Sequence, residues 1–191
     1  MRAISLLILS FAIFPQNAVA QSGEVRCPAP KTQFRTSLGG AAESLGDVGG
    51  FVCRFKDLKT GKTAERILGA FDFETPIVKA NIDKFRSLIP LQVGKSMSWS
   101  FSGASNLGGS GDWYYTISIE KYETITIPVG TLPSFVILQV EQTHAGGGRW
   151  ERRWWYSSLL GHIIKFEFKT VRGNPPPNYP KNWELIEIRS P

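Results

Sequence analysis

The chain has 191 residues, of which 42% are hydrophobic and 20% are charged. This composition is typical of a folded globular protein and excludes an intrinsically disordered chain. The 19 Gly and 12 Pro residues follow no period, so they indicate many turns and exclude a collagen-like repeat. The formal net charge of +6 favours anionic surfaces such as lipid head groups over nucleic acid, if the protein lies outside the cytoplasm.

The first twenty residues have the pattern of a secretory signal peptide. Arg2 precedes an apolar run from Ala3 to Phe14, and small residues at 18–20 fit cleavage after Ala20. The run is shorter than the roughly 20 residues that a transmembrane helix needs. We therefore expect residues 1–20 to be removed. Residues 21–191 are expected to form a single β-rich domain in the periplasm or outside the cell, with no integral membrane segment after processing.

Export determines how the two cysteines are interpreted. Thiols pair in an oxidising compartment, and only one pairing is available, so we predict a disulfide between Cys27 and Cys53. In the chain-entropy description, closing a loop of about 27 residues stabilises the fold by roughly 3.5 kcal/mol.

In chain order, the first predicted unit is a β-hairpin. Two stretches rich in apolar residues, 51–55 and 64–73, flank turn residues 57–62, where Gly61 can adopt a positive φ. Next, Thr75 and Pro76 predict the start of a helix. Apolar residues then recur at helical spacing up to Ile89, which predicts one amphipathic helix over Thr75–Ile89.

The rest of the chain is predicted to form β-strands. Met97, Trp99 and Phe101 alternate with serines, which is the period of a half-buried strand. Further segments rich in β-branched and aromatic residues follow at Trp113–Thr126, Ser134–Thr143, Arg149–Ser157, His162–Val171 and Trp183–Arg189. The predicted fold is α+β and mostly β. It is a curved antiparallel sheet, a half-barrel of about 8–10 strands, packed on one amphipathic helix.

Common catalytic and cofactor motifs are incomplete or absent in this sequence. Gly61–Thr63 and Gly94–Ser96 lack the upstream glycine of a phosphate-binding loop. The two histidines, His144 and His162, have no metal-ligand spacing, and no Gly-x-Ser-x-Gly motif is present. We therefore predict no catalytic residues, no metal, no other cofactor and no nucleotide or nucleic-acid partner. An enzyme, such as a hydrolase, is the least favoured class.

The most informative segment is the strand pair at 150–156 and 162–171. Ile164, Phe166 and Phe168 alternate with charged residues and should face inward. A register that pairs the aromatic faces places Tyr156 opposite His162, Trp154 opposite Ile164, Arg152 opposite Phe166 and Trp150 opposite Phe168. Arg152 then projects into an aromatic face, where its charge needs a partner.

Two interpretations of Arg152 follow. In the structural one, it stacks on the tryptophans and pairs with an internal carboxylate such as Glu120 or Glu141. In the functional one, it anchors the carboxylate or phosphate of an amphipathic ligand whose apolar part lies on the aromatic side chains. The candidate ligand-binding residues are Trp150, Arg152, Trp154, Tyr156, Phe166 and Phe168. If these aromatics face solvent, they form a protein interface instead.

Three segments, Ile89–Ser96, Glu123–Leu132 and Trp155–Lys165, resemble a large uncharacterised group of exported bacterial proteins. The resemblance covers about half the chain, and the sequence departs from the group's pattern at turn positions, namely Val129, Leu132 and Ser158–Leu159. It implies a curved β half-barrel like that of periplasmic lipoprotein and lipid carriers. The group has no established catalytic residue to transfer.

The function predicted from these observations is that of a soluble, non-enzymatic binding protein for a hydrophobic or amphipathic ligand, such as a lipid or acyl chain. This function requires a cavity beside Arg152. The alternative is a protein-interaction or envelope scaffold module that contacts an envelope protein. Such a module would show an exposed apolar patch or an unpaired sheet edge.

Overall fold

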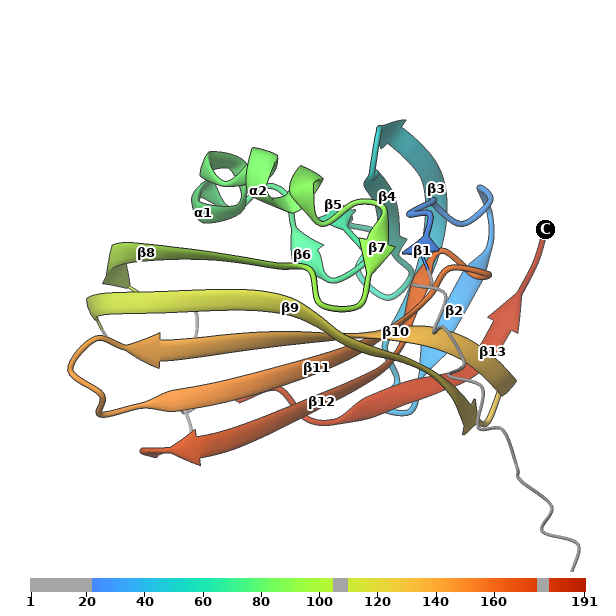
Figure 1. Cartoon of the computed structure of the whole chain (residues 1–191). Coiled ribbons are helices and arrows are strands. Elements are labelled where there is room, and N and C mark those ends of the chain that lie inside the picture. Colours follow the sequence, from blue (N-terminus) through green and yellow to red (C-terminus); the bar gives the residue numbers. More distant parts are fainter. Residues whose placement is uncertain (1–21, 105–109, 175–178) are drawn as a thin grey trace, which may run out of the picture.

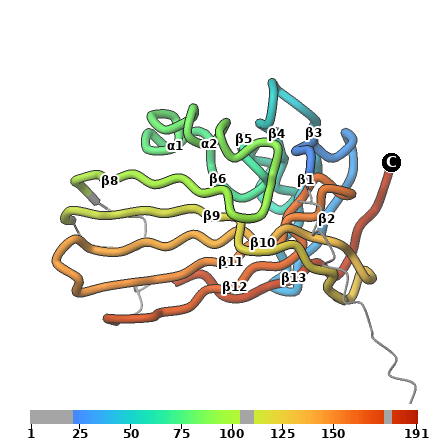
Figure 2. Tube along the Cα trace, viewed as in Figure 1, coloured from blue at the N-terminus to red at the C-terminus, as the bar shows by residue number. Residues whose placement is uncertain are grey.

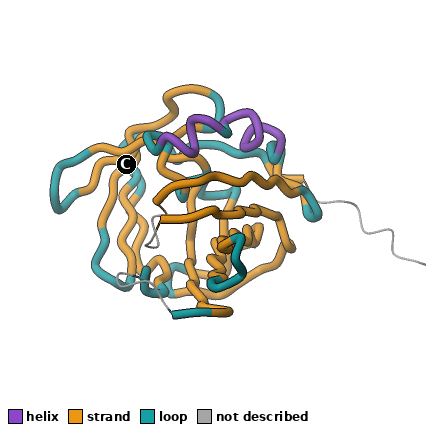
Figure 3. The backbone as a smooth tube through the Cα atoms, turned by 90° about the vertical axis from the view of Figure 1, so that its left-hand side faces the viewer, coloured by secondary structure: helices purple, strands orange, loops and turns teal. Residues whose placement is uncertain are grey.

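The computed structural model describes residues 22–104, 110–174 and 179–191. Its main feature is one antiparallel sheet of 11 strands, in the order β6-β5-β4-β3-β2-β13-β12-β11-β10-β9-β8 (Figure 1). The sheet curls on itself, and two short helices lie over one side of it (Figure 3). The strands at its two ends, β6 and β8, are not paired with each other, so the sheet is curved but not closed. The predicted signal peptide, residues 1–20, lies outside the described residues.

The sheet has two arms, which differ in strand length and direction. The C-terminal arm consists of long strands that run side by side across Figure 1: β8 (Ser96–Ala104), β9 (Ser110–Ile127), β10 (Gly130–Thr143), β11 (Arg149–Ser157) and β12 (His162–Arg172). The N-terminal arm consists of shorter strands: β2 (Gln33–Thr36), β3 (Ala41–Gly49), β4 (Val52–Asp57), β5 (Thr63–Ile67) and β6 (Phe71–Asp72). Along the chain trace, β2–β4 rise steeply at the right-hand end of the molecule (Figure 2).

The last strand, β13 (Trp183–Arg189), joins the two arms. It pairs with β12 through Lys165–Glu184 and Phe166–Trp183, and with β2 through four residue pairs. The two arms are therefore joined by a strand that contacts the C-terminal arm over a short length.

The predicted mostly-β fold with a curved antiparallel sheet is confirmed. All six strands predicted after residue 96 are present, and the predicted hairpin is formed by β4 and β5. Its second strand ends earlier than predicted, because Leu68 and Gly69 adopt positive φ values of 55° and 70° and turn the chain into β6. The sheet has 11 strands rather than about 8–10, since the short strands of the N-terminal arm lack a clear alternating pattern.

The prediction of one continuous helix is wrong. The structure has α1 (Pro76–Ala80) and α2 (Ile82–Ser87), separated at Asn81, where φ is −115° and ψ is 19°. The Asn81 side-chain amide donates a hydrogen bond to the carbonyl of Ile77, four residues earlier. An asparagine side chain that competes for backbone groups in this way disfavours a regular helix. The predicted start at Thr75–Pro76 is confirmed, and Val78 and Phe85 are the buried residues of the two helices.

The predicted register between β11 and β12 is also wrong. Tyr156 pairs with Ile163, Trp154 with Phe166, Arg152 with Phe168 and Trp150 with Thr170, and the register shifts between Trp155 and Tyr156. The shift is a β-bulge that places Ile164 beside Trp155, away from Tyr156. A bulge inserts one residue without changing the hydrophobic pattern much, so the sequence could not reveal it. The inward orientation of Arg152 and Phe166 is nevertheless as predicted.

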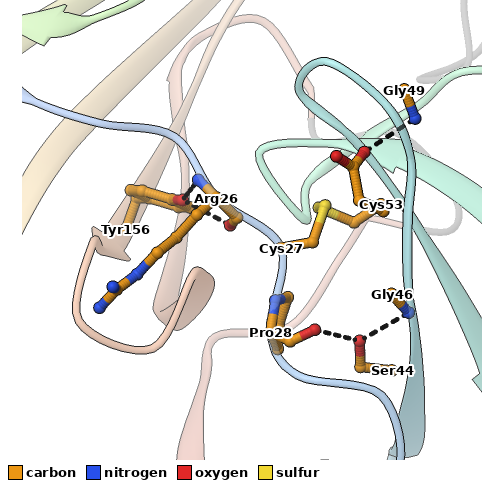
Figure 4. Close-up of a disulfide and its surroundings, with 9 residues drawn as sticks. Arg26, Cys27, Pro28, Ser44, Gly46, Gly49, Cys53 and Tyr156 are labelled. Atoms are coloured by element: carbon orange, nitrogen blue, oxygen red, sulfur yellow. Dashed lines mark hydrogen bonds between the residues drawn. A yellow bond between two sulfur atoms is a disulfide. The ribbon is translucent and has the colours of Figure 1, made fainter.

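The segment before β2 ties the arms together. The predicted disulfide is confirmed: Cys27 is bonded to Cys53 of β4, with a Cα–Cα distance of 5.4 Å (Figure 4). Next to it, the Arg26 guanidinium donates hydrogen bonds to the carbonyls of Ser158 and Leu159 in the β11–β12 turn. A second, two-stranded sheet pairs β1 (Ser22–Gly23) with β7 (Leu91–Gln92). None of the described helices is long and apolar enough to cross a membrane.

Candidate functional site

The inner face of the C-terminal arm is built from cross-strand rows of side chains. Because side chains alternate along each strand, directly paired residues of neighbouring strands lie on the same face and contact each other. One row contains Trp99, Tyr115, Glu141 and Trp150. The next row contains Met97, Ile117, Gln139, Arg152 and Phe168, and a third contains Ile119, Ile137, Trp154, Phe166 and Trp183.

A cavity of about 330 Å³ lies between this face and the helices. The sheet side contributes apolar and aromatic side chains from β8, β9, β11, β12 and β13, and β10 contributes the amide of Gln139. The opposite wall comes from α1, α2, β6 and residues on either side of β6. The main apolar contributors are Phe71, Ile77, Val78, Phe85, Trp99, Tyr115, Ile117, Trp154, Phe166 and Trp183. The helices therefore cover the inner face without filling the space beneath them.

Polar side chains line the cavity on two sides: Asp72 and Thr75 on the side of β6, and Gln139 and Arg152 on the C-terminal arm. Gln139 of β10 and Arg152 of β11 are directly paired, and both line the cavity. The Arg152 Nη2 atom lies 3.7 Å from the Oε2 atom of Glu141, whose side chain is 2% exposed. An opposite charge at this distance compensates a buried guanidinium, which would otherwise be costly. On this side, the cavity thus borders a compensated charge pair next to an amide.

This geometry decides between the predicted partners of Arg152. Glu141 is the internal carboxylate. The other candidate, Glu120, pairs instead with the neighbouring Arg153, at 3.0 Å. The predicted stacking of Arg152 on tryptophan is not observed, because the cation–π contacts among the described residues involve Lys79, Arg86 and Lys165. The ion pair with Glu141 therefore compensates the buried charge of Arg152.

The structure brings three of the six predicted ligand-binding residues to the cavity, namely Arg152, Trp154 and Phe166. The other three point to the same side of the sheet but pack elsewhere. The Tyr156 hydroxyl accepts a hydrogen bond from the Arg26 amide and donates one to the Arg26 carbonyl (Figure 4). Burial raises the pKa of Tyr156 to about 12, so this hydroxyl stays protonated at neutral pH. Tyr156 thus holds the N-terminal segment in place.

Trp150 and Phe168 lie beyond the cavity along their strands. Trp150 packs against Trp113, with 5.8 Å between ring centroids, and its indole N–H donates to the carbonyl of Asn174. Phe168 stacks on Tyr179. A ligand-binding role for the six residues stays a prediction. Arg152, Trp154 and Phe166 are the ones placed to contact a molecule in the cavity.

Sequence reasoning missed most of the cavity wall. Trp99 could have been included, because its strand showed a clear alternation and its inward face was known. Phe71, Ile77 and Phe85 could not, because their position depends on how the helices cross the sheet. Two lining residues also carry unused donors: the buried indole N–H groups of Trp99 and Trp154 have no hydrogen-bond partner among the described residues.

Comparison with known proteins adds little to this description. No protein-family model and no curated protein matches the sequence. Among solved structures, the fold is similar to that of the hypothetical lipoprotein YmcC from Escherichia coli K12. The TM-score is 0.44 at 12% sequence identity, over 74% of this chain and 79% of the other. A likeness of this degree says nothing about what either protein binds.

Proposed function

We propose that this protein is an exported, non-enzymatic binding protein whose inner cavity holds the apolar part of a hydrophobic or amphipathic ligand, such as a lipid or acyl chain. The observation that carries the proposal is the 330 Å³ cavity beside Arg152 and Trp154. Its volume falls at the lower end of the range of roughly 300–1,000 Å³ for small-molecule sites. The disulfide supports export, because such bonds persist outside the reducing cytoplasm.

The lining favours a mostly apolar occupant with one polar group. Aromatic and aliphatic side chains form most of the wall, and the polar groups are Gln139 and Arg152 on the C-terminal arm and Asp72 and Thr75 on the side of β6. Small-molecule sites commonly combine an apolar wall with a few placed polar groups that fix the ligand's orientation. Because Glu141 already compensates Arg152, the polar group inside the cavity should be neutral, such as a hydroxyl or an ester.

The proposal can be tested with two probes of equal chain length, dodecanol and dodecanoate. The oxidised protein, purified after export without detergent, is first examined by native mass spectrometry for a retained adduct, and binding of the probes is then measured by tryptophan fluorescence. We expect saturable binding of both. Failure of both probes to bind, together with a bare polypeptide mass, would overturn the proposal.

Replacing each of two alanines by phenylalanine tests whether the probes bind in the cavity. Ala70 borders the cavity, so Ala70→Phe should fill part of it and weaken the binding of both probes. Ala80 lies at the exposed end of α1 and does not line the cavity, so Ala80→Phe should leave binding unchanged. Circular dichroism and thermal unfolding show whether both variants are folded. Equal binding by the two folded variants would place the probes elsewhere.

A second candidate function rests on the edge strand β8. This nine-residue strand ends the sheet, and its outer edge is paired with none of the described strands. One edge carbonyl, that of Ser98, accepts a hydrogen bond from the Lys84 ammonium. An envelope protein could add a strand along the remaining edge. In that case the probes would not bind, and a partner protein would protect β8 amides from hydrogen exchange.

A further inference from the structure

A second hollow, of about 660 Å³, adjoins the cavity on the side of the N-terminal arm. We refer to it as the cleft. Four residues line both the cavity and the cleft: Ala70, Asp72, Trp154 and Trp183. A ligand whose chain occupies the cavity has only to pass these shared residues to place its other end in the cleft. The composition of the cleft therefore bears on which ligand the protein takes.

One part of the cleft is an aromatic floor. His162 lies in it, stacked on Phe34 with 4.1 Å between ring centroids and tilted against Phe55 at 5.1 Å. Its Nδ1 atom is buried and has no hydrogen-bond partner among the described residues. Burial lowers the pKa of His162 to about 3, and the nearby positive charge of Arg66 adds to this effect. The floor is therefore uncharged at neutral pH, and any charge recognition must come from the rim.

The rim carries two acidic and two basic side chains, and these differ in how they are engaged. The Asp57 carboxylate accepts hydrogen bonds from the backbone N–H groups of Lys59 and Thr60, and the Asp72 carboxylate accepts one from that of Glu74. Both acids thus serve local turns. By contrast, the Lys62 and Arg66 side chains form no hydrogen bond or ion pair with any described residue. Two cations at the rim are available to a ligand.

Arg66 is the better placed of these cations. It lies on β5 directly opposite Asp72 of β6, one of the residues that border both hollows. Lys62 precedes Arg66 by four residues, which corresponds to about 13 Å along an extended strand, away from the shared wall. The neighbouring Asp72 carboxylate weakens the attraction of Arg66 for an anion. Removing the charge of Asp72 is therefore expected to strengthen anion binding.

We propose that the cleft binds the anionic head group of an amphiphile, a carboxylate or a phosphate, with the Arg66 guanidinium as its anchor and the apolar chain in the cavity. This inference rests on the proposed function and names the ligand class. Guanidinium groups suit both anions, because their fork of N–H donors matches two oxygens. The assignment differs from the sequence-based one, which gave this role to Arg152. Arg152 already has a carboxylate partner, and Arg66 does not.

The test compares charged and neutral probes on matched variants. For the wild-type protein, dodecanoate and dodecyl phosphate should bind more tightly than dodecanol. Arg66→Gln should raise the Kd of dodecanoate about tenfold, as expected for loss of a charge-assisted contact, and leave the Kd of dodecanol unchanged. Lys62→Gln removes the same charge from the same rim and should change the Kd of dodecanoate less than about threefold. Asp72→Asn should lower it.

The outcomes separate this inference from the proposed function. If neither dodecanol nor dodecanoate binds, the proposed function fails. If both bind and Arg66→Gln leaves their ratio of Kd values unchanged, only the head-group assignment fails. Inorganic phosphate is the probe for a free anion and should bind far more weakly than dodecyl phosphate. If it binds equally well, and in an Arg66-dependent manner, the cleft is a site for a free anion and the amphiphile is excluded.

Discussion

The two arms of the sheet use different means to stay folded. The C-terminal arm has strands of 9 to 18 residues, and β9 and β10 alone pair along 14 positions. Its inner face is almost continuously apolar. The N-terminal arm has strands of two to nine residues, and its first segment is held by the Cys27–Cys53 disulfide. Extended pairing and apolar burial stabilise the first arm, whereas a covalent link compensates for the smaller contact area of the second.

Two arginines, one in each arm, show what this difference implies for charge. Arg152 lies within the C-terminal arm, with its side chain 15% exposed, and a buried carboxylate compensates it. Arg66 lies at the rim of the N-terminal arm, is exposed, and has no ion pair among the described residues. A buried charge has to be matched within the protein, whereas water solvates an exposed one until a ligand replaces it. The rim can therefore offer a free cation at little cost in stability.

The largest expected effect comes from removing the carboxylate of the buried pair. Glu141→Gln leaves the Arg152 guanidinium in an apolar environment without its counter-charge. Breaking one side of a buried pair typically costs about 3–5 kcal/mol, so we expect the free energy of unfolding to fall by about that amount. Urea denaturation of the variant and the wild type measures the difference. The double variant Glu141→Gln/Arg152→Gln should be more stable than the single variant.

An exposed pair on the N-terminal arm provides the control. Arg54 and Glu65 are separated by only 2.6 Å, yet their side chains are 46% and 23% exposed. Exposed ion pairs contribute between zero and about 1 kcal/mol, so Glu65→Gln should change the stability by less than about 1 kcal/mol. The longer, buried pair is thus expected to matter more than the shorter, exposed one. Equal costs for the two substitutions would contradict the proposed difference between the arms.

The next largest effect concerns the disulfide. Replacing both Cys27 and Cys53 by alanine frees a loop that spans 26 positions, and we expect a loss of about 3.5 kcal/mol in the free energy of unfolding. Hydrogen exchange followed by mass spectrometry locates the change. Amides of β2–β5 should exchange faster than in the wild type, while those of β9–β11 should respond less.

The reduced wild-type protein is the control for this experiment, because it lacks the bond but keeps both sulfur atoms. It should behave like the double alanine variant. An equal increase of exchange in both arms would show that the bond stabilises the molecule as a whole and would contradict its assignment to the N-terminal arm.

The sequence predicted the C-terminal arm better than the rest of the fold, for a physical reason. Long strands with one buried face carry a period-two pattern, as Met97, Trp99 and Phe101 do, and such a pattern survives small errors in boundaries. Short strands such as β2 and β6 contain too few residues to show a period. The break at Asn81 and the bulge at Ile164 depend on single side-chain and packing events. No spacing rule reports such events.

The sequence predicted the face of the sheet on which the candidate site lies, but not most of the residues that form its wall. The alternation of charged and apolar residues along β12 identified its inner face. Pairing β11 against that face correctly placed Arg152 on the inner side of the sheet. The wall formed by Phe71 and Phe85 was out of reach, since it depends on the path of the chain over the sheet. The same holds for the cleft, because the proximity of Arg66 to Trp154 and Trp183 comes from the curvature of the whole sheet.

The third prediction concerns His162, which lies where the two arms meet. Its pKa falls from 6.5 to about 3 on folding, mainly because burial disfavours the charged imidazolium. Between these values, the unfolded chain binds a proton at this residue and the folded protein does not. Stability therefore decreases as the pH falls from about 6.5 toward 3, by about 1.4 kcal/mol per pH unit from this group. His162→Phe keeps a ring against Phe34 and Phe55 but has no titrating group.

The prediction is a difference between two pH profiles, because acidic residues also titrate in this range. Urea denaturation between about pH 7 and 4 should show a steeper loss of stability for the wild type than for His162→Phe. His144→Phe, at an exposed position, is the matched control for replacing a histidine by phenylalanine. If His162→Phe has the wild-type slope, the imidazole is protonated without unfolding, and water reaches the junction between the arms. That result would show that His162 belongs to the solvated part of the molecule and not to the buried core.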